Sequence, residues 1–192
     1  MNLKRIVCIG DSLTAGYGIQ TNHRWSNLLS NDLKIEVINS GISGDTTSGM
    51  LARFYEMAIK HKPNYIIITG GTNDIWLNLS NNIIIGNILA MTRYAKHHDI
   101  IPIIGIPTPF FYQGDFTDQS PFIDVPSLSK RINSFQKTLK QLALDDNQNF
   151  IDFTLNMNPE LFLKDGLHPN EKGHILMSVN AKLGLTSFFN HI

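Results

Sequence analysis

The chain has 192 residues, a length that fits one domain and can bury a core without disulfide staples. Lys and Arg together number 16, as do Asp and Glu, so the sequence carries no basic footprint for nucleic acid or an anionic membrane. A hydrophobic content of 42% with 17% charged residues is typical of an ordinary globular protein.

The cysteine content and the N-terminus bear on the compartment. Cys8 is the single cysteine, which excludes an intramolecular disulfide and fits a reducing environment. The first residues, MNLKRIVCIGDS, lack the long apolar segment of a signal peptide. No window approaches the ~20 apolar residues of a membrane span. We therefore expect a cytoplasmic protein without a membrane span, and the sequence does not predict its oligomeric state.

Short apolar runs bounded by Gly, Pro or Asn alternate with amphipathic segments along the chain. The runs predict five strands, at 5–10, 36–40, 65–70, 100–106 and 149–153. The amphipathic segments predict helices, at 23–33, 47–61, 82–97, 128–144 (with Ser127 as N-cap) and 170–189. This alternation predicts a single α/β domain over 1–192, with helices on both faces of a doubly wound parallel sheet.

Polar or glycine-rich stretches follow each predicted strand. In open parallel sheets, ligands bind beyond the carboxyl ends of the strands. The stretches that reach this edge are GDSLTAG at 10–16, SGISGDTT at 40–47, GGTND at 70–74, the long segment 107–126, and LKDGLHP at 163–169. We expect a functional site there.

Ser12 is either a nucleophile at the end of a strand or an ordinary residue of a glycine-rich turn. A nucleophile needs a base and a group that orients the base. His168 differs from the other histidines because it lies in a loop, and a turn through Gly166 can bring the Asp165 carboxylate to one of its ring nitrogens. Taken alone, the Asp165–His168 spacing is more often a helix or turn cap.

An attacked carbonyl also needs donors for its developing oxyanion, each worth ~3 kcal/mol of barrier. The Ser12 backbone N–H is one candidate, Gly44 is a second because glycine allows close backbone approach, and the Asn73 side-chain amide is a third. Each has a plain structural explanation as a turn or cap residue. Their joint placement after three successive strands favours the functional one.

The stretches GDSLTAG, SGDT, GGTND and DGLHP resemble, in order and spacing, the blocks of the GDSL or SGNH hydrolase family. The similarity extends from residue 4 to about 185 and is strongest to the compact bacterial esterase, thioesterase and lysophospholipase branch. It implies a flavodoxin-like three-layer α/β/α sandwich with a five-stranded parallel sheet. It also implies serine-dependent acyl hydrolysis through an acyl-enzyme, without metal or cofactor.

The resemblance also implies residue roles. Ser12 would be the nucleophile, His168 the base and Asp165 its partner, while the oxyanion hole would consist of Ser12, Gly44 and Asn73. Asp11 would support the serine loop, and Asp74 would support the Asn73 loop. The substrate would be a small carboxylic ester or thioester, a lysophospholipid or an acetylated sugar, and the sequence does not choose among them.

An apolar wall for the acyl chain is expected from aromatic residues near the site. Trp76, Pro107, Phe110 and Phe111 are the candidates, with Leu77, Tyr112, Phe116 and Phe122 nearby. The alternatives are that the 107–126 loop pins itself to the core with these side chains, or that it forms a lid, a subunit interface or a lipid contact.

Two other functions compete with acyl hydrolysis. A flavodoxin-like module could hold a phosphate or another small ligand in the first loop, but GDSLTAG matches neither known glycine-rich phosphate pattern. A metal hydrolase could use Asp11, Asp74, Asp165 and His168, and it would lose activity on chelation.

Overall fold

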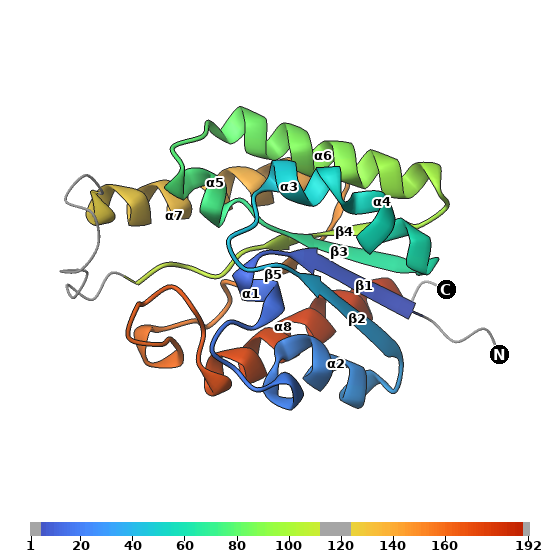
Figure 1. The fold of residues 1–192 in the computed structure, drawn as a ribbon, viewed down its shortest axis with the longest axis horizontal. Coiled ribbons are helices and arrows are strands. Elements are labelled where there is room, and N and C mark those ends of the chain that lie inside the picture. The colour runs from blue at the N-terminus through green and yellow to red at the C-terminus, as the bar shows by residue number, and fades with distance from the viewer. Residues whose placement is uncertain (1–4, 112–123, 190–192) are drawn as a thin grey trace.

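The computed structural model describes residues 5–111 and 124–189, with side chains up to residue 186 (Figure 1). Its five strands form one sheet in the order β2-β1-β3-β4-β5, and all neighbours are parallel. This confirms the predicted flavodoxin-like sheet. The strands are β1 (Arg5–Gly10), β2 (Glu36–Gly41), β3 (Tyr65–Thr69), β4 (Ile101–Ile106) and β5 (Asn149–Asp152).

The central strands are buried on both faces, which explains their continuous apolar sequences. Every residue of β3 is buried, and in β1 only Arg5 keeps partial exposure. The alternating side chains of these strands enter two separate cores, one on each face of the sheet. One core receives Val7, Ile66 and Ile68, and the other receives Cys8 and Ile67.

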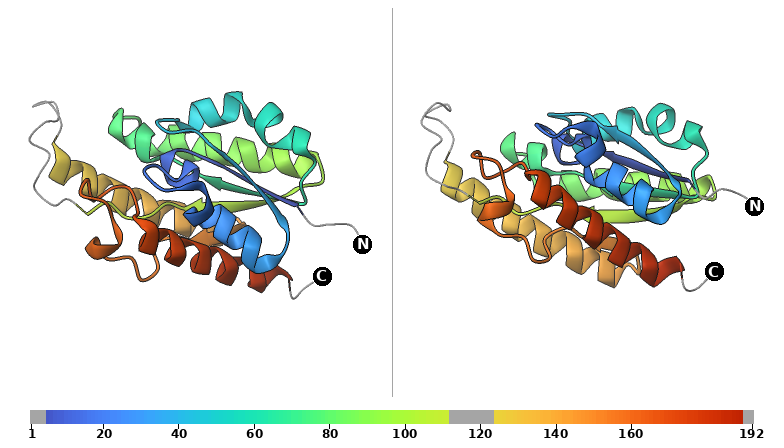
Figure 2. Two further views of the ribbon diagram at one scale, coloured as in Figure 1. Left: turned by 60° about the horizontal axis from the view of Figure 1, so that its bottom comes forward. Right: turned by 90° about the horizontal axis from the view of Figure 1, so that it is seen from below.

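Two layers of helices sandwich the sheet (Figures 1 and 2). One face is covered by α2 (Trp25–Leu33) and α8 (Glu171–Phe189). The other is covered by α3 (Thr47–Ala52), α4 (Phe54–Met57), α6 (Asn81–His97) and α7 (Val125–Asp145). Two short helices, α1 (Ser12–Ala15) and α5 (Thr72–Trp76), and the 3₁₀ turns η1 (Thr21–His23), η2 (Ile59–His61) and η3 (Pro159–Leu161) complete the described elements.

Two helix predictions need correction. The segment 47–61 is not one helix, because it breaks at Arg53 into α3 and α4 and ends in η2. Helix α7 begins at Val125, one turn before the predicted start, and Ser127 is therefore not its N-cap. The cap is Asp124, whose side chain accepts the Ser127 N–H at 3.2 Å, with a proline in the first turn as is common there.

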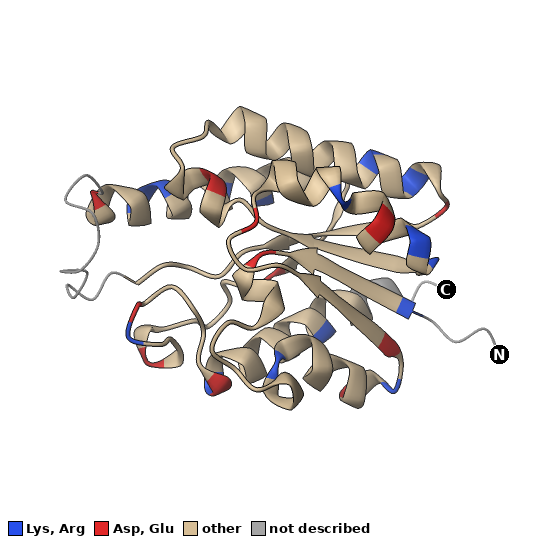
Figure 3. Ribbon diagram, in the orientation of Figure 1, with Lys and Arg blue, Asp and Glu red and all other residues tan. Residues whose placement is uncertain are grey.

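Charged positions of both signs are spread over the two helical layers (Figure 3). Neither layer is dominated by one sign, in keeping with the balanced composition. In the described part of the chain, none of the helices combines the length and the apolar character that crossing a bilayer requires.

A buried histidine joins the two helices of one layer. His174 of α8 has no exposed surface, and its Nδ1 accepts the backbone N–H of Trp25, the first residue of α2, at 3.1 Å. Burial lowers the pKa of His174 to about 4, and the charges of Arg24 and His168 act in the same direction. The neutral ring therefore serves as the cap of α2.

We expect this histidine to make folding stability depend on pH. Its folded-state pKa lies below the ordinary 6.5, so the unfolded chain takes up a proton that the folded chain resists. Stability is full above pH 6.5 and falls by about 3 kcal/mol as the pH drops to 4. Urea titrations across this range check the effect.

The variant His174→Asn keeps an acceptor for the Trp25 N–H and should flatten that part of the pH dependence. His97→Asn, at an exposed position of α6, should leave it unchanged. Equal slopes for wild type and His174→Asn would contradict the assignment.

Candidate active site

The register of three strands gathers the site. Gly10, the last residue of β1, pairs with Gly41 of β2 on one side and with Thr69 of β3 on the other. The three strands therefore end level with one another. The loops that follow them carry Ser12, Gly44 and Asn73, which explains why residues far apart in sequence meet at one sheet edge.

Ser12 is the first residue of α1 and is almost buried, with 8% of its surface exposed. Asp11 is the N-cap of this helix, and its Oδ1 accepts the Leu13 N–H at 2.9 Å. The N–H of a first-turn residue has no intrahelical acceptor. The Ser12 N–H is therefore available to an external acceptor.

The structure brings Ser12, His168 and Asp165 together. His168 Nε2 lies 2.9 Å from Ser12 Oγ, and His168 Nδ1 lies 2.7 Å from Asp165 Oδ2. An ionised carboxylate only accepts hydrogen bonds, so Nδ1 carries the proton of the neutral ring and Nε2 accepts from the serine hydroxyl. This is the arrangement that lets a histidine remove the serine proton.

Backbone donors fix the Asp165 carboxylate. Its Oδ1 accepts the N–H groups of Leu167 and His168, each at 2.9 Å, in a turn through Gly166 at φ +65°. Burial by itself would raise the pKa of Asp165, but the hydrogen bonds from the His168 ring and from these two N–H groups outweigh it and hold the pKa below its usual value. The group is thus ionised around neutral pH.

Tyr17 is a site residue that the sequence reasoning missed. Its ring lies against the His168 imidazole, with centroids 4.4 Å apart and planes tilted by 38°. Gly16 and Gly18 flank it, both at positive φ, and the tyrosine is half exposed. An aromatic residue between two glycines directly after the serine motif was the available signal. The contact can hold the imidazole in place.

Gly44 and Asn73 approach the same edge from the loops after β2 and β3. Gly44 has φ +81°, a left-handed conformation that favours glycine. A Cβ there would meet nothing within 4 Å, so the residue faces open space. Asn73 Nδ2 donates to the Asp45 carbonyl at 2.8 Å, which leaves its second N–H for another acceptor. Each residue can thus offer an N–H group to an external acceptor at this edge of the sheet.

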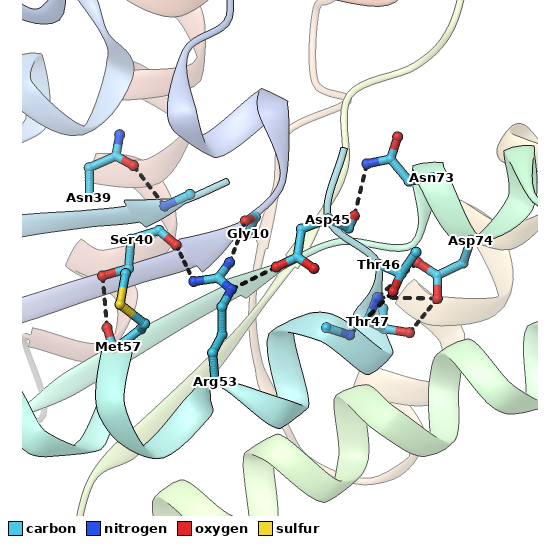
Figure 4. A network of polar contacts seen from close by, with 12 residues as sticks. Gly10, Asn39, Ser40, Asp45, Thr46, Thr47, Arg53, Met57, Asn73 and Asp74 are labelled. Carbon is cyan, nitrogen blue, oxygen red and sulfur yellow. Dashed lines mark hydrogen bonds and ion pairs between the residues drawn. The ribbon is translucent and has the colours of Figure 1, made fainter. Parts of the chain in front are cut away.

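Asp74 connects the loops after β3 and β2 (Figure 4). Its fully buried carboxylate accepts the Thr47 N–H at 2.9 Å and the Thr47 hydroxyl at 2.5 Å. Because Asp74 itself lies beside Asn73, these bonds tie the Asn73 loop to the loop that carries Gly44. Gly71 lets α5 lie close to α6 and α7, since a Cβ there would be 2.7 Å from Phe135 and 2.9 Å from Ile84.

Asp11 carries an unusual carboxyl group. Oδ2 is buried and has no hydrogen-bond partner among the described residues. Burial raises the pKa of Asp11 to about 7; the Leu13 N–H and the His168 charge oppose the shift, while Asp74 and Asp45 add to it. The carboxyl group beside the serine is thus more readily protonated than an ordinary aspartic acid.

The expected apolar wall divides into buried and accessible members. Pro107 and Phe110 are buried, and Phe110 belongs to a core that also contacts Trp76. Trp76 and Phe111 keep partial exposure, and the Phe111 N–H donates to the Gly166 carbonyl at 2.9 Å. Tyr112, Phe116 and Phe122 lie outside the described residues.

Three of the four residues of the alternative metal site bind other protein side chains. Asp74 binds Thr47, and Asp165 binds His168. Among residues 5–111 and 124–189, no group of three or more His, Cys, Asp or Glu side chains is arranged to hold a metal ion.

Comparison with known proteins identifies the family. A model of the GDSL-like lipase/acylhydrolase family matches residues 8–176. The chain belongs to this family. The GDSL motif of the family name is the stretch that ends β1 and opens α1.

Individual GDSL relatives are similar over nearly their whole length. An arylesterase of Vibrio mimicus is 28% identical over 86% of this chain and 80% of its own. A protein of Escherichia coli named thioesterase 1/protease 1/lysophospholipase L1 is 25% identical over 97% of this chain and 85% of its own. A solved G-D-S-L family structure from Desulfitobacterium hafniense has a TM-score of 0.80 at 27% identity, covering 94% of this chain and 99% of that one.

Asp11 yields a prediction on stability. Its folded-state pKa is raised, so its favourable contribution is complete below pH 4 and is lost as the pH rises through about 7. Asp11→Asn keeps the acceptor for Leu13 and never ionises. We expect its free energy of unfolding, relative to wild type, to rise by up to about 4 kcal/mol between pH 4 and pH 8.

The difference in free energy of unfolding between variant and wild type is measured by chemical denaturation at each pH. Its change with pH is the test, because burying the amide nitrogen adds a cost that is the same at every pH. Asp145→Asn at the exposed end of α7 is the matched control and should show a constant difference. A constant difference for Asp11→Asn as well would refute the prediction.

Proposed function

We propose that the protein hydrolyses small carboxylic esters by acyl transfer through Ser12. One observation carries the proposal: a continuous chain of hydrogen bonds runs from Asp165 through both ring nitrogens of His168 to Ser12 Oγ. In this role His168 is the general base, and Asp165 fixes its tautomer and stabilises the imidazolium. The lowered pKa of Asp165 suits that task.

The reaction has two halves. His168 Nε2 takes the Ser12 proton while Oγ bonds to the substrate carbonyl carbon, and the resulting tetrahedral oxyanion collapses as His168 protonates the leaving alcohol. Water then loses a proton to His168 and attacks the acyl-enzyme, and the bond to Oγ breaks as His168 returns the proton to Ser12. The products are one carboxylic acid and one alcohol.

Three donors serve the oxyanion in this scheme: the Ser12 N–H, the Gly44 N–H and the free N–H of the Asn73 amide. Each such donor contributes about 3 kcal/mol to the transition state. Asp11 supports the serine loop as N-cap of α1, and Asp74 supports the Gly44 loop through Thr47.

Apolar side chains around the site favour an apolar substrate. Tyr17, Ile42 and Leu77 are exposed large hydrophobic residues on the loops that carry Ser12, Gly44 and Asn73. Together with the accessible parts of Trp76 and Phe111, they suit an aryl ester better than an acetylated sugar, whose hydroxyl groups need polar partners. The similarity to an arylesterase supports this choice. The cytoplasmic location stays a prediction.

A non-catalytic small-ligand or phosphate module is the weaker alternative. It gives no reason for a histidine and a carboxylate to converge on Ser12, and family membership favours hydrolysis.

Substitution of the nucleophile tests the reaction. We expect Ser12→Ala to lower kcat for p-nitrophenyl acetate by about 10⁴-fold or more and to abolish labelling by a fluorophosphonate probe. Ser134→Ala, at an exposed position of α7, is the control and should behave as wild type. A wild-type protein that neither hydrolyses the ester nor takes the label would overturn the proposed function.

The substrate class has its own test. Tyr17→Ala should reduce kcat/KM for p-nitrophenyl acetate about tenfold, as loss of an aromatic contact implies, and reduce it less for methyl acetate followed by acid release. Tyr55→Ala removes a similarly exposed tyrosine that contacts His98, away from the site, and should have no effect. Equal losses on both esters, or a preference of the wild type for acetylated xylose or an acyl thioester, would argue against an aryl substrate.

A further inference from the structure

Arg53 forms a three-way connection behind the site (Figure 4). It lies at the junction of α3 and α4, and its guanidinium donates from Nε to Asp45 Oδ2 at 2.6 Å, from Nη1 to the Ser40 carbonyl at 2.7 Å and from Nη2 to the Gly10 carbonyl at 2.9 Å. The side chains of the ion pair are only 15% and 12% exposed. A planar guanidinium fixes its donors relative to one another, so the three acceptors are held in one arrangement.

Gly10 and Ser40 lie at the carboxyl ends of β1 and β2, and Asp45 lies in the loop after β2; these segments lead to or carry the proposed backbone oxyanion donors. Gly10 lies two residues before Ser12, and Asp45 directly follows Gly44. The Gly10 carbonyl also accepts the Ile42 N–H at 3.0 Å, and the Asp45 N–H donates to the Ile42 carbonyl at 3.1 Å. Gly44 thus sits in a closed turn whose two ends are both connected to Arg53.

Asp45 is held from several sides. Its main-chain carbonyl accepts Asn73 Nδ2, while its carboxylate lies against α3. A Cβ on Gly49 would come within 1.9 Å of Asp45 Oδ1, so only glycine at this position of α3 admits the carboxylate. One residue therefore receives the positioning contacts of both Arg53 and Asn73.

We propose that Arg53 is a positioning residue for acyl transfer, which sets the Gly44 N–H at its working distance from the Ser12 N–H. It does this through Asp45 on one loop and the Gly10 carbonyl on the other, without touching the substrate. The inference rests on the proposed ester hydrolysis and adds to it a residue outside the family blocks that the sequence reasoning used.

Lysine cannot replace arginine here, because a single ammonium cannot reproduce three donors in a rigid fork. Arg53→Lys keeps the positive charge and loosens the Gly44 turn. The oxyanion develops in the transition state and is absent from the bound substrate, so we expect kcat to fall about 10- to 100-fold while KM changes less than about threefold.

Arg5→Lys is a matched control. Arg5 is the first residue of β1, and Gly10, whose carbonyl Arg53 binds, is the last. Arg5 also donates from Nε to a carboxylate, Glu36, and from Nη1 to a carbonyl, that of His61. Both variants lose a guanidinium that connects β1 to its surroundings, but only Arg53 lies at the site. We expect wild-type kcat for Arg5→Lys with p-nitrophenyl acetate, and a smaller drop in melting temperature than for Arg53→Lys, because the Arg5–Glu36 pair is more exposed.

A double-mutant cycle tests whether Arg53 acts through the turn. Gly44→Ala, strained at φ +81°, should lower kcat by itself. Adding Arg53→Lys to this variant should then lower kcat by less than about a further threefold. Asp45→Asn, which keeps the carbonyl for Asn73, should reproduce the kcat loss and serves if Arg53→Lys fails to fold. If the kcat loss of the double variant equals the product of the two single-variant losses, the inference is overturned.

The outcomes separate this inference from the proposed function. If Ser12-dependent hydrolysis is present and Arg53→Lys has the same kcat as Arg5→Lys, or loses activity through KM alone, Arg53 is structural and only the inference fails. If the wild type shows no Ser12-dependent hydrolysis, the proposed function itself fails.

Discussion

The shared register of β1, β2 and β3 at their carboxyl ends is the constraint on which the site depends. Gly10 is paired in the sheet with Gly41 on one side and Thr69 on the other, so the three following loops begin at the same level of the sheet. A slip of one residue in either pairing would move Gly44 or Asn73 by about 3 Å relative to Ser12, more than an oxyanion contact tolerates. The buried, mainly apolar strands resist that slip, and packing of the core thereby supports the geometry of the loops.

Polar contacts at the sheet edge fix the loops that the strands bring together. The loop after β2 is bound from α3 by Arg53 and from the region after β3 by Asn73 and Asp74. These contacts are largely buried, where a hydrogen bond to a charged group is stronger and a lost partner costs more. In the proposed reaction, the donors for the oxyanion are accordingly preorganised by neighbours that take no part in bond making. Asp11 Oδ2 is one of the buried polar atoms that have no hydrogen-bond partner among the described residues, and Asp11 directly precedes Ser12.

Sequence reasoning found the strands and the proposed Ser12, His168 and Asp165 because these follow from residue type, order and the rule for parallel sheets. It could not find Arg53, since the apolar spacing of residues 47–61 is compatible with one continuous helix and the break depends on tertiary contacts. Tyr17 was not predicted for a related reason: its partner, His168, is 151 positions away, and no local pattern predicts a ring contact. The start of α7 was misplaced because Asp124 and Ser127 are both good capping residues.

The proposed base His168 and its proposed partner Asp165 occupy a single turn, which is held by a hydrogen bond from the Phe111 N–H to the Gly166 carbonyl and by one from the Leu163 N–H to the His168 carbonyl. Opening that turn removes both groups from Ser12 at once, yet disturbs none of the sheet. Local openings of this kind need less free energy than global unfolding. Heat would therefore inactivate such an enzyme reversibly, at temperatures where its circular dichroism still reports an intact fold.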